Sequence, residues 1–126
     1  MKKQKQQIID YIVSNHEKID VEGGKCRWNY MCHMNSVHEA VENNDDKLAM
    51  CVYIDDDYPI VHFVNIHDDK YVDNTLGQWS SQYNYYLIRT ISKDEFFDIM
   101  DIFRKYRSYL RTVPSWWLTI FRKYDA

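Results

Sequence analysis

Cys32, His62 and Asp73 are three residues of this sequence whose side chains together can perform nucleophilic chemistry. A thiolate attacks carbonyl carbons, and an imidazole accepts and returns the proton. A carboxylate that is hydrogen-bonded to the imidazole fixes its tautomer and stabilises its charged form. Whether the three side chains meet depends on the helices and strands that carry them.

His62 and Asp73 lie on two neighbouring predicted strands, residues 59–66 ("PIVHFVNI") and 70–76 ("KYVDNTL"). Side chains alternate between the faces of a strand. If residues 68–69 form a two-residue loop, His62 lies diagonal to Asp73, and with a four-residue loop it lies directly opposite. Both registers place the two side chains on one face and within reach. The same spacing is typical of an ordinary cross-strand polar pair, so a catalytic pair also requires a nucleophile.

The candidate nucleophile is a cysteine at the start of a helix. Residues 29–43 ("NYMCHMNSVHEAVEN") predict a helix that Asn29 caps, with Cys32 in its first turn. The partial positive charge at a helix N-terminus lowers the pKa of a thiol there. Cys26 is an alternative if the helix begins earlier, because it would then take the terminal position. Cys51 lies in an apolar run and is expected in the core.

The remaining pattern predicts an α+β domain. A helix is expected over residues 3–18, and the capping box of Ser92 and Glu95 opens another over 93–111. The other expected elements are strands over 48–54 and 83–91 and a short last helix from Pro114. We therefore expect one domain over residues 1–126, an antiparallel sheet of about four strands packed with the Cys-bearing helix and C-terminal helices.

Composition narrows the function classes. The chain has 126 residues and a net charge of -3, which makes nucleic acid an unlikely partner. Neither a secretory signal nor a membrane-spanning segment is expected, and we predict a cytoplasmic protein with free thiols. His33 and His38 are badly spaced for one metal ion, and no glycine-rich phosphate loop is recognisable. We therefore expect neither a cofactor nor a metal.

The C-terminal stretch from residue 104 combines positive charge with aromatic side chains. Its basic residues are Arg104, Lys105, Arg107, Arg111, Arg122 and Lys123, interleaved with Tyr106, Tyr109, Trp116, Trp117, Phe121 and Tyr124. Such a segment can bind an acidic partner, a nucleic acid or a membrane surface. It is equally typical of a helix that packs its aromatic side chains on the core and leaves its charges in water.

The stretch "HFVNIHDDKYVDNTLG" resembles a segment of the transglutaminase-like and papain-like cysteine enzyme superfamily. In that segment a strand histidine leads through a short turn into an Asp motif, which Val72-Asp73-Asn74-Thr75 matches. "CHMNSVHEA" is similar to a C-x-x-N-[AS] helix start found in some small members. The resemblance implies a papain-like fold, with Cys32 as nucleophile, His62 as base and Asp73 as its orienting partner.

The functional expectation is a cysteine-dependent hydrolase or acyltransferase that acts on an amide, isopeptide or thioester of a protein or peptide-like substrate. Backbone N–H groups at the helix start would stabilise the oxyanion, and Asn35 or Gln78 would assist. The alternative is a non-enzymatic protein of the same fold. It resembles small phage or mobile-element products, and would bind a host protein through the basic aromatic C-terminal segment.

Overall fold

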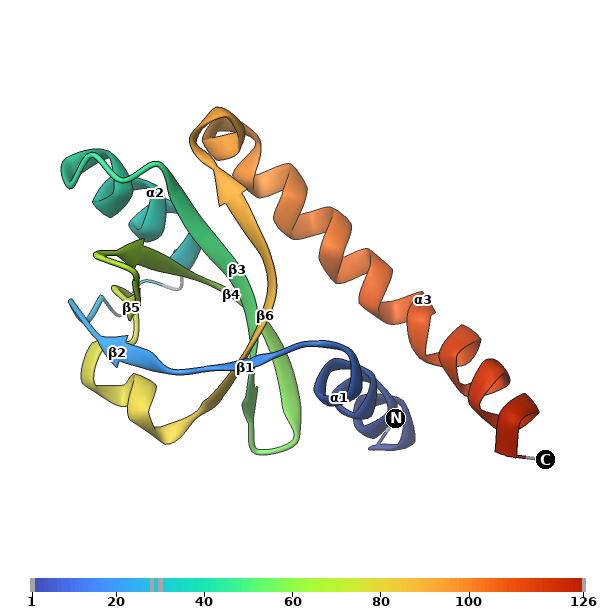
Figure 1. The fold of residues 1–126 in the computed structure, drawn as a ribbon. Helices are drawn as coiled ribbons and strands as arrows, with labels where there is room; N and C mark the ends of the chain where they lie inside the picture. The colour runs from blue at the N-terminus through green and yellow to red at the C-terminus, as the bar shows by residue number, and fades with distance from the viewer. Residues whose placement is uncertain (1, 28, 30, 126) are drawn as a thin grey trace.

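A computed structural model describes residues 2–27, 29 and 31–125, with side chains described for 5–27, 29 and 31–112. The chain folds in the order α1 (Lys2–Asn15), β1 (Lys18–Ile19), β2 (Val21–Gly23), α2 (Cys32–Glu42), β3 (Lys47–Asp55), β4 (Tyr58–His67), β5 (Lys70–Asp73), η1 (Gly77–Gln82), β6 (Asn84–Ser92), η2 (Lys93–Asp98) and α3 (Ile99–Asp125). η1 and η2 are 3-10 helices. The architecture is α+β (Figure 1).

The sheet curls until it is nearly a barrel. Its six strands follow the order β1-β6-β3-β4-β5-β2. The pairing of β2 with β5 is parallel and the other pairings are antiparallel. Asp20 alone separates β1 from β2, yet these two strands pair with opposite edges of the sheet. Both edges must therefore approach each other, as Figure 1 shows where β1 and β2 run continuously across the sheet.

The two faces of the sheet bury different side chains. One face packs against the helices around Ile12, Ala40, Leu48, Phe63, Ile91, Ile99 and Leu110. The other face encloses a second cluster, Ile19, Ala49, Cys51, Tyr53, Val64 and Tyr85. Both clusters exclude water from the strands; Cys32 belongs to the first, and the second lies on the same face of the sheet as His62 and Asp73.

A two-residue turn joins β4 and β5. Asn65 pairs with Val72 and His67 with Lys70, which leaves only Asp68 and Asp69 in the loop. Both loop residues have positive φ, 50° and 60°. This conformation suits the right-handed twist of a hairpin, and Asp tolerates it better than most residues. The even-length loop predicted from the sequence is therefore confirmed.

Several sequence predictions need correction. The sheet has six strands and mixed pairing where about four antiparallel strands were expected, and it supports the α+β class without supporting the papain-like assignment. β1 and β2 have only 2 and 3 residues, too few to produce a recognisable alternation. Their formation also ends the first helix at Asn15, although it was expected to reach residue 18.

The C-terminal end of the chain differs from the prediction as well. The capping box of Ser92 and Glu95 is confirmed, but it opens η2 before α3 begins at Ile99. α3 then continues to Asp125 as one helix through Pro114, where a separate short helix was expected. Proline removes one backbone hydrogen bond and thus weakens a helix without forbidding it.

In the part of the chain that the structure covers, no helix combines the length and the apolarity needed to cross a bilayer.

We predict that Gly77→Ala destabilises the fold. Gly77 has a φ of 55°, and an added Cβ would lie 2.8 Å from Cβ of Cys26. Left-handed strain and this overlap should lower the free energy of unfolding by about 1–3 kcal/mol. Urea denaturation measures the change. The matched control is Gln78→Ala on the same 3-10 helix, whose side chain is exposed. Equal stability of the two variants would contradict the prediction.

Candidate active site

His62 and Asp73 form a buried pair on the face of the sheet that lies away from the helices. Nε2 of His62 lies 2.8 Å from Oδ2 of Asp73. Only 4% of His62 and 0% of Asp73 is exposed to solvent. The hairpin register places them diagonally, as the two-residue loop requires. Because Nε2 contacts the carboxylate, Nδ1 is the ring nitrogen that remains available to a reacting group.

Asp73 receives hydrogen bonds from three further donors. The backbone N–H groups of Thr75 and Leu76 donate to Oδ1 at 2.9 and 2.8 Å. The hydroxyl of Tyr85 donates to Oδ2 at 2.6 Å. Burial raises the pKa of the Asp73 carboxyl, but these donors and the imidazolium of His62 outweigh burial and lower its pKa. Asp73 is therefore a carboxylate that holds the His62 ring in one orientation.

Tyr85 reaches Asp73 across the interior of the curled sheet. It lies on β6, and two strands separate β6 from β5 in the sheet. In a flat sheet that separation would be about 14 Å, because neighbouring strands lie about 4.8 Å apart. Sequence reasoning missed Tyr85, since the contact follows from the curvature and no local pattern records it.

Cys32 is the first residue of α2, which begins three positions later than the sequence predicted from Asn29. The N-cap is Met31, and the structure shows no side chain that caps it. The N–H groups of the first turn have no acceptor within the helix, and they point out of its positive end. Cys32 is thus at a helix start, as predicted, and Asn29 accepts the Met31 N–H at 3.1 Å without being the cap.

α2 lies along the edge of β4 that β5 leaves unpaired. Oγ of Ser36 donates to the Phe63 carbonyl at 3.1 Å, and Nδ2 of Asn65 donates to the Ser36 carbonyl at 2.7 Å. β5 pairs only with residues 65–67 of β4, so the edge of β4 at Phe63 is free to meet the helix. The thiol of Cys32 consequently lines the same pocket as the His62 ring, and His62 and the backbone N–H of Phe63 both favour its thiolate.

The electrostatics of Cys32 and His62 favour an ion pair. Burial raises the pKa of the Cys32 thiol, but hydrogen bonds from His33 and His62, the positive charge of His62 and the Phe63 N–H together lower the pKa to about 6. Burial likewise lowers the pKa of His62, yet Asp73 and the Cys32 thiolate together raise it to about 9. Between these values the site holds a thiolate beside an imidazolium.

His33 is a second imidazole beside the thiol. It favours the thiolate of Cys32 and stacks on Phe103, with ring centroids 6.2 Å apart. The sequence analysis considered His33 only as a metal ligand. Its place directly after a cysteine at a helix start was the signal that could have identified it.

A pocket of about 200 Å³ opens at the thiol. It is lined by Arg27, Cys32, Tyr53, Ile60, Val61, His62, Thr75, Leu76 and Phe103. Its walls are mainly apolar, which strengthens the charge interactions inside. Cys32 and His62 face a space large enough for a small acyl group.

The other predicted site residues lie elsewhere. Gln78 is exposed on η1 and does not line the pocket of Cys32. Asn35 is buried and donates to Oδ1 of Asn29 at 3.0 Å and to Oγ1 of Thr75 at 2.9 Å. Its amide thus joins α2 to the residues after β5.

The alternative nucleophile Cys26 is exposed and pairs with Leu76 in an isolated β-bridge, away from the helix start. Cys51 is fully buried, as expected, and burial raises the pKa of its thiol. The structure therefore brings Cys32, and not Cys26, to the His62 ring.

Side chains of the basic aromatic C-terminal segment are described up to residue 112, and its later members, Trp116, Trp117, Phe121, Arg122, Lys123 and Tyr124, lie outside the residues with described side chains. Its backbone belongs to α3. The predicted host-protein contact through this segment stays a prediction.

Over the described residues, no group of three or more His, Cys, Asp or Glu side chains is arranged to hold a metal ion. Comparisons of the chain with protein-family models, with curated proteins and with solved structures find no match.

We predict that Cys32 alkylates rapidly at low pH. Its thiolate forms as the pH rises through about 6, whereas an ordinary thiol titrates near about 8.5. Mass spectrometry of iodoacetamide labelling, measured from pH 5 to 10, gives the midpoint for each cysteine. In His62→Ala the positive charge is lost, so the midpoint for Cys32 should rise toward about 8.5. A midpoint that is the same in both proteins would contradict the predicted ion pair.

Proposed function

We propose that this chain is a cysteine-dependent acyl-transfer enzyme. Its substrate would be an amide, isopeptide or thioester of a protein or peptide-like molecule. The observation that carries the proposal is that Cys32 lines one pocket with His62, whose charge favours the thiolate, while His62 is hydrogen-bonded to Asp73. A helix-start thiol, a histidine and an orienting carboxylate in this order constitute a nucleophile, a proton carrier and its support.

The reaction begins with attack by the thiolate. The Cys32 sulfur bonds to the substrate carbonyl carbon, and the carbonyl oxygen becomes an oxyanion. The uncapped N–H groups of the first turn of α2 are the donors available to stabilise it. The imidazolium of His62 gives its proton to the leaving amine or thiol as the carbonyl–leaving-group bond breaks. An acyl-thioester on Cys32 remains.

The acyl group then passes to an acceptor. Neutral His62 takes a proton from water or from an amine, which attacks the thioester carbonyl and releases the Cys32 thiolate. Water gives hydrolysis and an amine gives transfer. Throughout, Asp73 keeps Nε2 of His62 engaged, so that Nδ1 exchanges the proton.

The contacts of Asn35 favour a positioning role. Its amide is engaged by Asn29 and Thr75, so it holds the start of α2 against the residues that follow Asp73. The resemblance to the transglutaminase-like and papain-like superfamily implies the same triad. That resemblance, including the fold it implies, stays a prediction, and the proposal rests on the contacts of the three side chains.

The test is acyl-enzyme formation with p-nitrophenyl acetate. The purified chain should release a burst of p-nitrophenolate equal to the enzyme concentration and gain one acetyl group on Cys32, as mass spectrometry would show. Cys32→Ala should lose the burst. His62→Ala should form the acetyl-enzyme at least about tenfold more slowly, so that no burst is seen. Cys26→Ala is the matched control and should retain the burst, because Cys26 is exposed and outside the pocket. Acetylation without preference for Cys32 would overturn the proposal.

The pH dependence of acetyl transfer follows from the same two groups. The rate should rise as pH increases through about 6, where the Cys32 thiolate forms, and fall through about 9, where His62 loses its proton. A bell-shaped profile with these limits is expected in steady-state assays with an amide substrate, whose leaving amine needs the proton. A rate that keeps rising above pH 9 would show that His62 does not act as the acid.

A further inference from the structure

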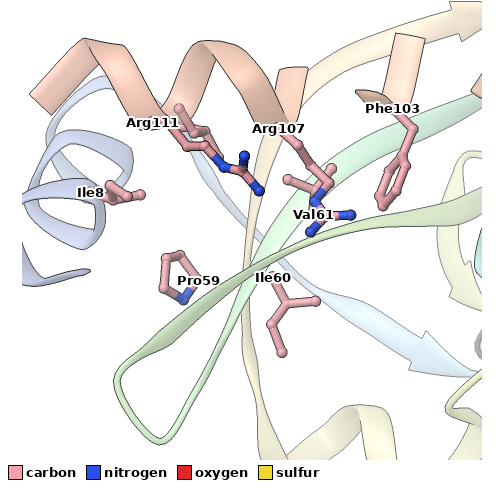
Figure 2. A pocket seen from close by; sticks show the side chains of 8 residues that line it. Ile8, Pro59, Ile60, Val61, Phe103, Arg107 and Arg111 are labelled. Atoms are coloured by element: carbon pink, nitrogen blue, oxygen red, sulfur yellow. The ribbon is translucent and has the colours of Figure 1, made fainter. Parts of the chain in front are cut away.

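A second pocket continues from the one at Cys32. It has a volume of about 390 Å³ and lies between α1, α3 and β4 (Figure 2). Ile60, Val61 and Phe103 line both pockets, so the two pockets adjoin, and we call the two together the groove. The lining of the second pocket is completed by Ile8, Pro59, Arg107, Leu110 and Arg111.

The floor of this groove is an unpaired strand edge. The carbonyl of Phe63 faces away from β3, because it accepts its hydrogen bond from α2. Backbone groups of an antiparallel strand alternate in direction, so the N–H and carbonyl of Val61 face the same way as those of Phe63. β5 ends its pairing with β4 at Asn65. An extended peptide can therefore add itself alongside Val61, as peptides do at other open sheet edges.

The wall opposite this edge carries two arginines. Arg107 and Arg111 follow Phe103 at intervals of four residues on α3, and Figure 2 shows both reaching toward β4. Among the residues with described side chains, neither arginine has a carboxylate within ion-pair distance. Arg27, in the first pocket, is different because it is 2.7 Å from Glu39. Two exposed arginines without an ion-pair partner, beside the apolar side chains of the second pocket, match an acidic ligand.

We propose that this groove binds an extended, acidic peptide segment of the substrate whose carbonyl reacts at Cys32. The inference rests on the proposed function and specifies its substrate class. Arg107 and Arg111 lie one and two helical turns beyond Phe103, or about 6 and 12 Å. An extended peptide covers about 3.3 Å per residue. The acidic side chains thus lie about two to four residues beyond the peptide residue that contacts Phe103.

The experiment measures protection of Cys32 from iodoacetamide, a neutral reagent. The probes are two blocked hexapeptides, one of alternating Leu and Glu and one of alternating Leu and Lys. At equal concentration the acidic peptide should slow labelling of Cys32 about fivefold more than the basic peptide. Labelling of the exposed Cys26 in the same sample should not change with either peptide.

Charge-reversal variants test the arginines directly. Arg107→Glu with Arg111→Glu should reverse the preference, so that the basic peptide protects Cys32 better. Arg104→Glu is the matched control, because Arg104 is exposed on the same helix and does not line the groove, and it should keep the preference for the acidic peptide.

Equal protection by both peptides, protection by neither, or a preference that survives the double reversal would overturn the inference. Failure of the proposed function gives a different result. In that case Cys32 forms no acetyl-enzyme and shows no low-pH labelling, while any difference between the two peptides remains measurable.

Discussion

The buried carboxylate of Asp73 is the group on which the site and the curvature of the sheet both depend. It has no exposed surface, so its charge must be balanced within the protein. His62 on β4, Tyr85 on β6 and the backbone after β5 provide that balance. These donors can converge only if the sheet bends around them. The same hydrogen bonds that satisfy the carboxylate therefore close the interior and fix the tautomer of His62.

The reactivity of Cys32 arises from how α2 meets the sheet. A thiol that is 9% exposed would be inert if burial alone determined its pKa. Because β5 pairs only with residues 65–67 of β4, the start of α2 can approach the open edge of β4, where His62 and the backbone of Phe63 lower the pKa of the thiol. Because Ser36 also bonds to that edge, the register of the helix against the strand determines where the thiol lies.

The sequence was most informative where a local pattern determines structure. Strand alternation and the short loop placed His62 and Asp73 on one face, and the helix pattern put Cys32 near an N-terminus within three residues of the observed start. Contacts between distant strands leave no such pattern. Tyr85 meets Asp73 only through curvature, and β1 and β2 are too short to show periodicity. The sequence also did not predict the groove, because its walls come from β4 and α3, and no local pattern records that these two elements lie side by side.

The connection between β1 and β2 also affects how the protein folds. Lys18 pairs with Tyr86, so one edge cannot form until most of the chain has been synthesised. Contacts this distant in sequence require costly loop closure and tend to form late in folding. Tyr85 on the same strand completes the set of donors around Asp73. The set of donors that keeps Asp73 ionised is thus complete only after the sheet has closed.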